Sequence, residues 1–404
     1  MTAERIDPAT AARPERRPEL DAIRALVVVG LVFFHSALVF DSRDDFYVKN
    51  TETTEVTTIF ASLGVVWAMP MLFLVAGLGS WHSLRHRGPA GFALERVRRL
   101  GVPLVFATVT IVPLPQWLRL RADPDYHESY LRFLPRFFDV RLAPGDFPFV
   151  LRGEHFETGH LWFVVLLLAF SLLLAPVAGW LPADRAHRIR DRAAGAVRHR
   201  GVVLLPAVAI GLVSALFGLE EGFAAWHRWA YLLFFLAGFV LAADERFRAA
   251  MRRDAVPAAV AGLLLFAIGL PGFLVAADSG DPFTDHTPLA VAARALYGAT
   301  GWCWLVAILG LLDRRRPAAA PTTSDGVRSR SRRLYDYLVA AVLPLYVLHQ
   351  PIVVAVAYGV VRWRAPIAVE YAAIVSVSLV LTALAYDLLV RRTRLTRFLF
   401  GLRG

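Results

Sequence analysis

Two ionisable side chains, Arg24 and His35, lie in the first long apolar stretch, "ELDAIRALVVVGLVFFHSALVFD", residues 19–41. In an α-helix their separation amounts to about 20° beyond three full turns and a rise of about 16–17 Å, so both face the same way. Asp21 lies about one turn before Arg24, near the same stripe. An imidazole titrates near neutral pH, which makes His35 a candidate general base. The alternatives are a positive-inside role for Arg24 and a structural hydrogen bond for His35.

Three further arginines, Arg96, Arg98 and Arg99, precede another apolar stretch in "ERVRRLGVPLVF", residues 95–106. Arg96 and Arg99 are about one helical turn apart. Because guanidinium groups bind phosphates through paired hydrogen bonds, these arginines and Arg24 predict a binding site for a phosphorylated cytosolic ligand. An ordinary positive-inside cluster is the alternative interpretation.

The segment "GEHFETGHLWFVV", residues 153–165, gathers polar and aromatic side chains just before the next apolar stretch. Its spacing differs from the HExxH pattern of metalloproteases, and no metal site is predicted. An aromatic ring beside polar groups suits stacking on a sugar. We therefore expect Glu154, Glu157, His160 and Trp162 to contact a substrate, with a solvated interfacial loop as the alternative.

A second intramembrane histidine, His349, lies in "LYVLHQPIVV", residues 345–354. It is about 14 residues from the predicted cytoplasmic start of its apolar stretch, which places it at a depth similar to that of His35. Pro344 and Pro351 would bend the helix and free backbone carbonyl groups. We expect His349 to line the same substrate cavity as His35; a structural pair is the alternative.

The composition identifies the elements that must carry these residues. The chain has 404 residues, of which 57% are hydrophobic and only 19% charged, and its mean hydropathy is +0.51. These values are typical of a protein that crosses a membrane repeatedly. The net charge of +11 comes from short arginine clusters between apolar runs and indicates cytoplasmic loops rather than a nucleic-acid partner. With Cys303 as the only cysteine, no intrachain disulfide can form.

The predicted fold is an all-α, polytopic membrane bundle of about ten transmembrane helices with both termini in the cytoplasm. A crossing needs roughly 20 apolar residues. Arginine-rich connections alternate with acidic or balanced ones, which gives the orientation. The predicted helices are 22–41, 59–81, 100–118, 160–181, 202–218, 228–243, 256–276, 289–312, 335–361 and 367–390.

The predicted domain organisation is a single membrane domain over residues 22–390, with a cytoplasmic segment at 1–21 and a cytoplasmic tail at 391–404. Within the domain, residues 119–159 form the longest outside loop. Its aromatic residues suggest that it packs partly on the membrane face. Residues 313–334, rich in Pro, Ala, Ser and Arg, form an inside linker.

"LDAIRALVVVGLVFFH" resembles the Arg-ten-residues-His signature of the acyltransferase-3 family of membrane acyltransferases. "MPMLFLVAGLGS", the Arg-x-x-Arg-Leu run before Pro103, "HLWFVVLLL" and "LYVLHQPI" follow in the family's order. Length, helix number and the late His-Gln-Pro resemble the branch that includes the glucan succinyltransferases. The chain departs from many members at Ala76-Gly77-Leu78, where they have Ser-Gly-Phe, so any role of that serine is absent.

The resemblance implies an O-acyltransferase of the bacterial plasma membrane that uses acyl-CoA as donor and a hydroxyl of a glycan or natural product as acceptor. Arg24 and His35 would be its essential pair, and Arg96 and Arg99 would match the donor-associated basic motif. Direct transfer and an acyl-histidine intermediate are both open. A transporter that relays protons through its histidines is the functional alternative. The acyl chain and the oligomeric state, a homodimer included, stay open.

Overall fold

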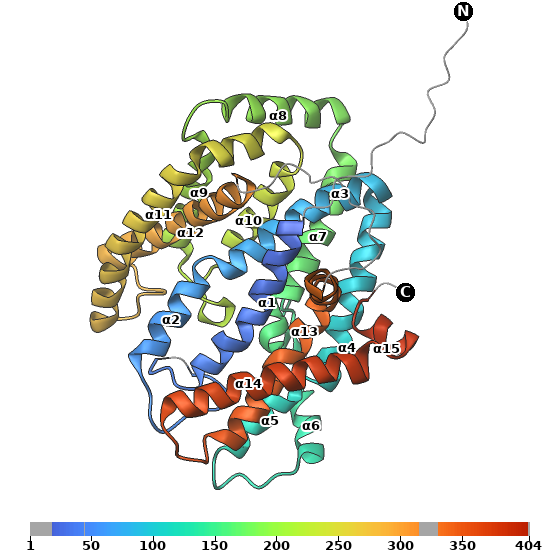
Figure 1. Ribbon diagram of the computed structural model, residues 1–404, viewed down its shortest axis with the longest axis vertical. Helices are drawn as coiled ribbons and strands as arrows, with labels where there is room; N and C mark the ends of the chain where they lie inside the picture. Colours follow the sequence, from blue (N-terminus) through green and yellow to red (C-terminus); the bar gives the residue numbers. More distant parts are fainter. Residues whose placement is uncertain (1–17, 44, 315–329, 403–404) are drawn as a thin grey trace, which may run out of the picture.

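The computed structural model describes residues 18–43, 45–314 and 330–402. Most of the predicted N-terminal segment and of the 313–334 linker lies outside the described residues. The described part is nearly all helical (Figure 1), with one pair of two-residue strands. The long helices are α1 (Pro18–Leu38), α3 (Ala68–Arg96), α7 (Trp162–Trp180), α11 (Glu245–Ser279), α12 (Pro288–Arg314), α13 (Arg330–Val360) and α14 (Ile367–Ala385).

Shorter helices complete the bundle and its connections. They are α2 (Glu55–Val65), α4 (Val102–Thr110), α5 (Pro113–Arg121), α6 (Tyr130–Phe137), α8 (Ala183–Ala196), α9 (Pro206–Phe217), α10 (Arg228–Leu241) and α15 (Arg394–Leu399). β1 (Arg141–Leu142) pairs with β2 (Leu151–Arg152) in antiparallel fashion. This hairpin and α6 occupy the predicted outside loop 119–159. Phe133 and Phe137 of α6 are buried, so part of this loop packs against the bundle.

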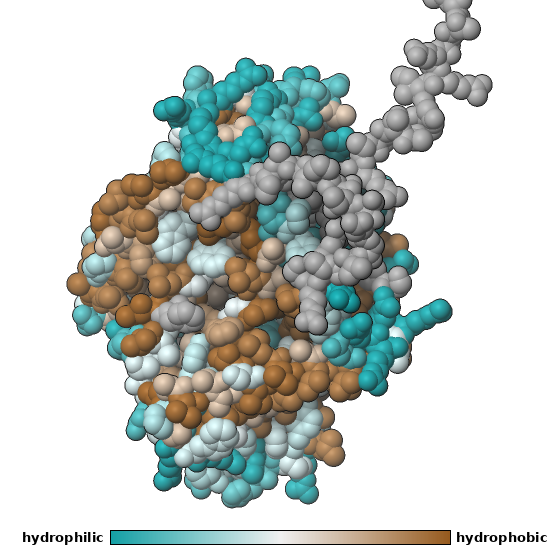
Figure 2. Space-filling view, in the orientation of Figure 1, coloured by the Kyte–Doolittle hydropathy of each residue, from teal (hydrophilic) through white to brown (hydrophobic). Residues whose placement is uncertain are grey.

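Eight segments of the described chain are long and apolar enough to cross a membrane. One of them, Glu55–Arg121, is 67 residues long and contains two of the predicted helices, and Val202–Phe217 is a shorter apolar helix. A multi-pass membrane protein is therefore confirmed, whereas the number of ten crossings stays a prediction. Figure 2 agrees, with apolar surface over α11 and α14 between hydrophilic surface over α8 at one end and around α6 at the other.

The connection between the second and third predicted helices is itself helical, which the sequence interpretation missed. α3 continues through a kink at Gly88, whose φ is 68°, followed by Pro89. The chain then forms a π-helix, η2 (Val97–Gly101), which carries Arg98 and Arg99. π-Helical turns are rare and concentrate at functional sites.

The bundle is assembled from packed helix groups. α11 packs along α12 and α12 on α9, α3 packs on α10, and α13 packs on both α1 and α14. The α3–α10 contact depends on two glycines. A Cβ added to Gly77 would lie 2.0 Å from the carbonyl oxygen of Phe235, and one added to Gly238 would lie 1.9 Å from that of Leu74. Small residues let membrane helices approach this closely.

Candidate active site

Three histidines from three elements meet in the structure. His35 lies in the last turn of α1, His349 in the middle of α13, and His160 in the 3₁₀ turn η4 (Gly159–Leu161) that begins α7. The ring centroid of His349 is 5.2 Å from that of His35 and 5.2 Å from that of His160. α1 ends at Leu38, three residues before the predicted limit of 41, so His35 lies in the last turn of its helix.

The hydrogen bonds assign tautomers to two of these rings. His349 Nδ1 is 2.6 Å from the carbonyl oxygen of Tyr346, and His160 Nε2 is 3.0 Å from that of Val347. A carbonyl oxygen only accepts, so both nitrogens carry a proton and donate it. His349 Nε2 then has a free lone pair. This nitrogen and Nδ1 of His35 are both buried and have no hydrogen-bond partner in the described part of the chain. The two orphaned nitrogens belong to neighbouring rings.

His160 is fixed by the same helix that carries His349. Its backbone N–H donates to Oε1 of Gln350 at 3.1 Å, and the Tyr346 hydroxyl donates to its carbonyl oxygen. Gly159 precedes it with φ +48°, and a Cβ there would lie 3.3 Å from the Tyr47 hydroxyl. A side chain at position 159 would strain the backbone and crowd this corner, so glycine is required there.

A cavity of about 760 Å³ opens beside the histidines, and His35, His160, Trp162 and Gln350 are in its lining. His35 is half-buried, whereas His349 is fully enclosed behind the cavity wall. The volume lies within the usual range for ligand sites. His35 therefore faces a ligand in the cavity, and the ring of His349 lies behind it, next to the ring of His35.

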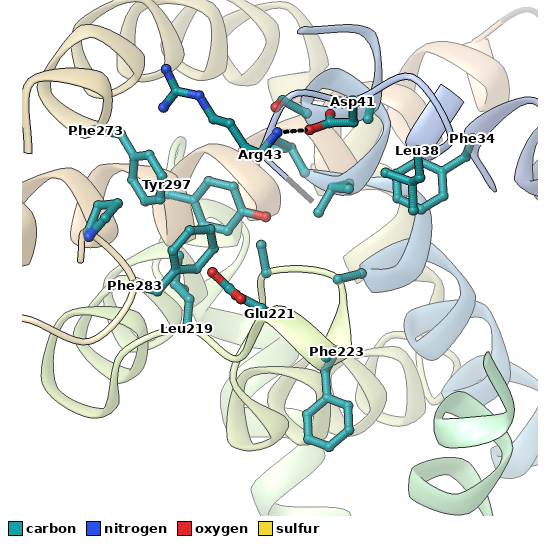
Figure 3. A pocket seen from close by; sticks show the side chains of 18 of the residues that line it. Phe34, Leu38, Asp41, Arg43, Leu219, Glu221, Phe223, Phe273, Phe283 and Tyr297 are labelled. Carbon is teal, nitrogen blue, oxygen red and sulfur yellow. Dashed lines mark hydrogen bonds between the residues drawn. The ribbon is translucent and has the colours of Figure 1, made fainter. Parts of the chain in front are cut away.

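Four connections that the sequence analysis placed outside converge on this cavity. Its lining includes residues from 41–47, 157–160, 219–225 and 280–283. Figure 3 shows Asp41 and Arg43 on one side of the pocket and Leu219, Phe283 and Tyr297 on another. The sequence analysis missed the cavity residues Tyr47, Glu221 and Tyr297, because a tyrosine or a loop glutamate has no distinguishing pattern.

Glu157 is the cavity residue whose ionisation is most clearly perturbed outside the spanning segments. Burial raises the pKa of its carboxyl group, while the Tyr47 hydroxyl, which donates to Oε1, and the nearby Arg119 oppose this shift. Glu154 differs, since its side chain is 82% exposed and is absent from the cavity lining. The structure thus separates these two carboxylates, which the sequence analysis had grouped as substrate contacts.

A second cluster forms around Arg24, in the first two turns of α1. Arg24 Nη2 donates to the carbonyl oxygen of Val75 at 3.0 Å, and Nη1 lies 3.4 Å from Asp21 Oδ1. Arg96 Nη2 donates to Ser80 Oγ at 3.3 Å. Both guanidinium groups therefore rest on the same two turns of α3. Asp21 thus pairs with Arg24 and lies at the end of α1 opposite the cavity.

Arg99 completes this cluster, and Arg98 is exposed beside it. The carboxylate of Glu95 is 3.3 Å from Arg99 Nη1 and 3.7 Å from Arg96 Nε. The two buried Nε atoms, those of Arg96 and Arg99, have no hydrogen-bond partner among the described residues. The cluster thus contains the carboxylates of Asp21 and Glu95 and a larger number of arginines, so its net charge is positive.

Other arginine clusters are more fully paired. Arg248 and Arg252 both contact Asp313, which is buried, and Arg253 pairs with Asp254. The Asp313 pairs join α11 to α12, whereas the Arg253–Asp254 pair lies within α11. The sequence cannot separate the two kinds of cluster, because both appear as arginines between apolar runs.

The face of α1 between Arg24 and His35 is closed by packing. Val28 and Leu31 occupy this stripe and are 2% and 8% exposed. The lining of the cavity includes His35 but not Arg24. The ends of α1 therefore form two distinct sites, joined by one continuous helix.

The fold and the site define a class: a multi-pass membrane protein in which an imidazole faces a ligand cavity and a cationic cluster lies at the far end of the same helix. The comparison with protein families specifies the class further. The acyltransferase domain of the acyltransferase-3 family matches residues 17–387, and the chain belongs to this family. It is therefore a membrane acyltransferase. Neither the curated proteins nor the solved structures contain a significant match.

Proposed function

We propose that this acyltransferase moves an acyl group from cytosolic acyl-CoA to a hydroxyl of a glycan or glycosylated natural product. The enzyme would lie in a bacterial plasma membrane, crossing it ten times with both termini in the cytoplasm, in the branch that resembles the glucan succinyltransferases. Acyl-CoA would dock on Arg24, Arg96, Arg98 and Arg99, and the acceptor would enter the cavity at His35.

The arrangement of α1 supports this proposal more than any other observation. Its cationic end and its histidine end share one helical face, and the rise between Arg24 and His35 is about 16–17 Å. An extended pantetheine arm spans roughly that rise, so phosphates held at Arg24 would bring the thioester to His35. Because Val28 and Leu31 close the stripe, the arm would have to displace them on binding.

In direct transfer, a single nitrogen of His35 carries the proton from the acceptor hydroxyl to the leaving CoA sulfur. His35 takes the proton of the acceptor hydroxyl, whose oxygen attacks the thioester carbonyl carbon. The new C–O bond forms, the C–S bond breaks, and the CoA sulfur leaves with the proton from His35. Both substrates must be bound together for this route.

The route through an acyl-histidine needs the substrates only in sequence. One nitrogen of His35 attacks the thioester carbonyl, the C–S bond breaks, and the CoA sulfur leaves as a thiol with the proton of the other ring nitrogen. The acceptor hydroxyl then attacks the acyl-imidazole carbonyl, the C–N bond breaks, and the hydroxyl proton returns to the ring. In both routes His349 would act as a positioning residue, because its Nε2 lone pair can accept a hydrogen bond from Nδ1–H of His35. The opposite nitrogen of His35 then carries the reactive lone pair.

The test is acyl-CoA consumption by purified protein with radiolabelled acetyl-CoA and succinyl-CoA. At acyl-CoA concentrations below the KM, wild type should release CoA, His35→Ala should release almost none, and Arg24→Ala should release it about tenfold more slowly. Label retained on protein without acceptor would identify the acyl-histidine route. Suppose that all three purified proteins consume acyl-CoA equally and that cells carrying each of them still form the product. Acyl-CoA would then not be the donor bound at Arg24, and His35 would have no catalytic role. A proton-coupled transporter predicts no consumption by any of them.

A further inference from the structure

The lining of the cavity has two chemically distinct parts. Polar side chains come from the outer loops and from α12. The other wall is apolar and comes from one face of α11, formed by Leu265, Phe266, Gly269, Leu270, Phe273, Leu274 and Ala277. Their spacing repeats every three to four residues, so they form one continuous stripe. From Leu265 to Ala277 this stripe, here called the α11 stripe, is about 18 Å long, more than half of a bilayer's hydrocarbon core.

The α11 stripe continues into the outer surface of the bundle. Leu274 lines the cavity and is also 43% exposed. On the same helix, Ile268 and Val275 are 65% and 57% exposed, and Figure 2 shows apolar surface over α11. α2 supplies the facing part of the lining through Ala61 and Val65, yet it packs mainly on α1 and not on α11. The cavity therefore borders the bilayer between α2 and α11.

One polar group in the wall favours a polar ligand. The Tyr297 hydroxyl is buried and has no hydrogen-bond partner among the described residues. Figure 3 shows Tyr297 and Glu221 at the same pocket, and both are in its lining. A long acyl chain lying here would leave the hydroxyl unsatisfied, which costs about 1–3 kcal/mol. A hydroxylated head group would satisfy it, so the polar wall favours the acceptor over the acyl chain as the occupant.

We propose that the acceptor is an amphipathic, membrane-borne molecule. Its hydroxylated head would lie between His35, Tyr297 and Glu221, and its apolar tail would follow the α11 stripe into the bilayer. This inference rests on the proposed function and adds the substrate class and the direction of access. Acceptor would reach His35 from within the membrane, while acyl-CoA would reach it from the arginine cluster.

A photocrosslinking experiment tests the tail's position without requiring turnover. The probe is dodecyl glucoside with a diazirine on its alkyl chain, in phosphatidylcholine vesicles that contain the full-length protein. We expect crosslinks concentrated on the α11 stripe, reduced by unlabelled dodecyl glucoside but not by methyl glucoside, which lacks the tail. Crosslinks spread evenly over the exposed face of α11 would overturn the proposal.

Two substitutions on neighbouring residues sharpen this test. Leu274→Trp places a larger ring where the stripe meets the bilayer and should reduce stripe crosslinking about tenfold. Val275→Trp is the matched control, since Val275 is exposed but absent from the cavity lining, and it should have no effect. Tyr297→Phe removes only the hydroxyl and should weaken competition by dodecyl glucoside up to about tenfold, the equivalent of one hydrogen bond. Equal crosslinking in both tryptophan variants would contradict membrane access.

A turnover experiment separates this proposal from the proposed function. Membranes containing the enzyme are given radiolabelled acetyl-CoA or succinyl-CoA, and the products are partitioned between organic solvent and water. Label in the organic phase, lost in His35→Ala, supports a membrane-borne acceptor. Label only in water-soluble products would overturn this inference and leave the acyltransfer from CoA intact. If no acyl-CoA is consumed, the donor proposal fails, and the crosslinking result still decides the site of the tail.

Discussion

The imidazole rings of His35 and His349 lie with their centroids 5.2 Å apart, and each has a buried nitrogen without a partner among the described residues. Nδ1 of His35 and Nε2 of His349 are a matched donor and acceptor once His349 donates from Nδ1 to Tyr346. The pair therefore has the components of a base held in one tautomer by a second residue.

His35→Ala should lower kcat by about 10²–10⁴-fold, the usual contribution of a general base. The KM for acyl-CoA should change little, because the donor would bind at the other end of α1. Steady-state kinetics of the purified enzyme measures both. His286→Ala is the control, as His286 is an exposed histidine away from the cavity lining. A His35→Ala enzyme with unchanged kcat would remove His35 from the chemistry.

His349→Leu should lower kcat by about 10–100-fold with little change in KM, because the ring of His35 loses Nε2 of His349 as a hydrogen-bond acceptor. His349→Gln keeps an acceptor oxygen and should restore part of the loss. The pH profile of kcat distinguishes positioning from simple packing, and it should shift in the leucine variant. An unchanged profile with reduced yield of folded protein would instead indicate a structural role.

Arg24→Ala and Arg96→Ala should each raise the KM for acyl-CoA by about tenfold or more, since charge-assisted hydrogen bonds to phosphates contribute about 1.5–3 kcal/mol. Arg192→Ala, which removes an exposed arginine of α8, controls for general loss of positive charge. Binding of dephospho-CoA and CoA, measured by calorimetry, tests the same site without turnover. Equal affinity of all variants for CoA would place the donor site elsewhere.

Most spanning helices could be predicted from the sequence, because long apolar runs define them and charged residues mark their ends. α1, α7, α12 and α14 begin and end within a few residues of the predicted limits. The kink at Gly88 and the π-helix that follows could not be predicted, since they depend on how α3 and α7 pack. From its polarity alone, the arginine-rich connection between the predicted helices 59–81 and 100–118 is expected to be a loop.

The site was only partly predictable for a related reason. His35 and His349 stand out because a titratable group is rare in an apolar run, and the structure brings them together. Tyr297 has no such signal, because tyrosine is common in membrane helices. The separation of Glu154 from Glu157 also depends on tertiary structure, since only the second meets Tyr47 in the folded protein.

Glu157 should make stability depend on pH. Burial raises the pKa of its carboxyl group above the ordinary value of 4.5, so ionisation costs more in the folded state than in the unfolded state. Its contribution to stability is therefore greatest below the unfolded pKa and decreases as the pH rises through the folded pKa. In Glu157→Gln this decrease should disappear. Thermal unfolding in detergent between acid and neutral pH measures the difference, and parallel curves for both proteins would contradict it.

Gly238 should be the position in the α3–α10 contact that is least tolerant of a methyl group. A Cβ there would lie 1.9 Å from the carbonyl oxygen of Leu74, a backbone atom that cannot move without separating the helices. Gly238→Ala should destabilise the protein by about 1–3 kcal/mol, the typical cost of overpacking. Gly30→Ala is the matched control, because no atom lies within 4 Å of a Cβ at Gly30 in α1. That variant should be neutral or slightly more stable, as alanine favours helix. Thermal unfolding of both variants in detergent decides, and a neutral Gly238→Ala would show that α3 and α10 are not packed this closely.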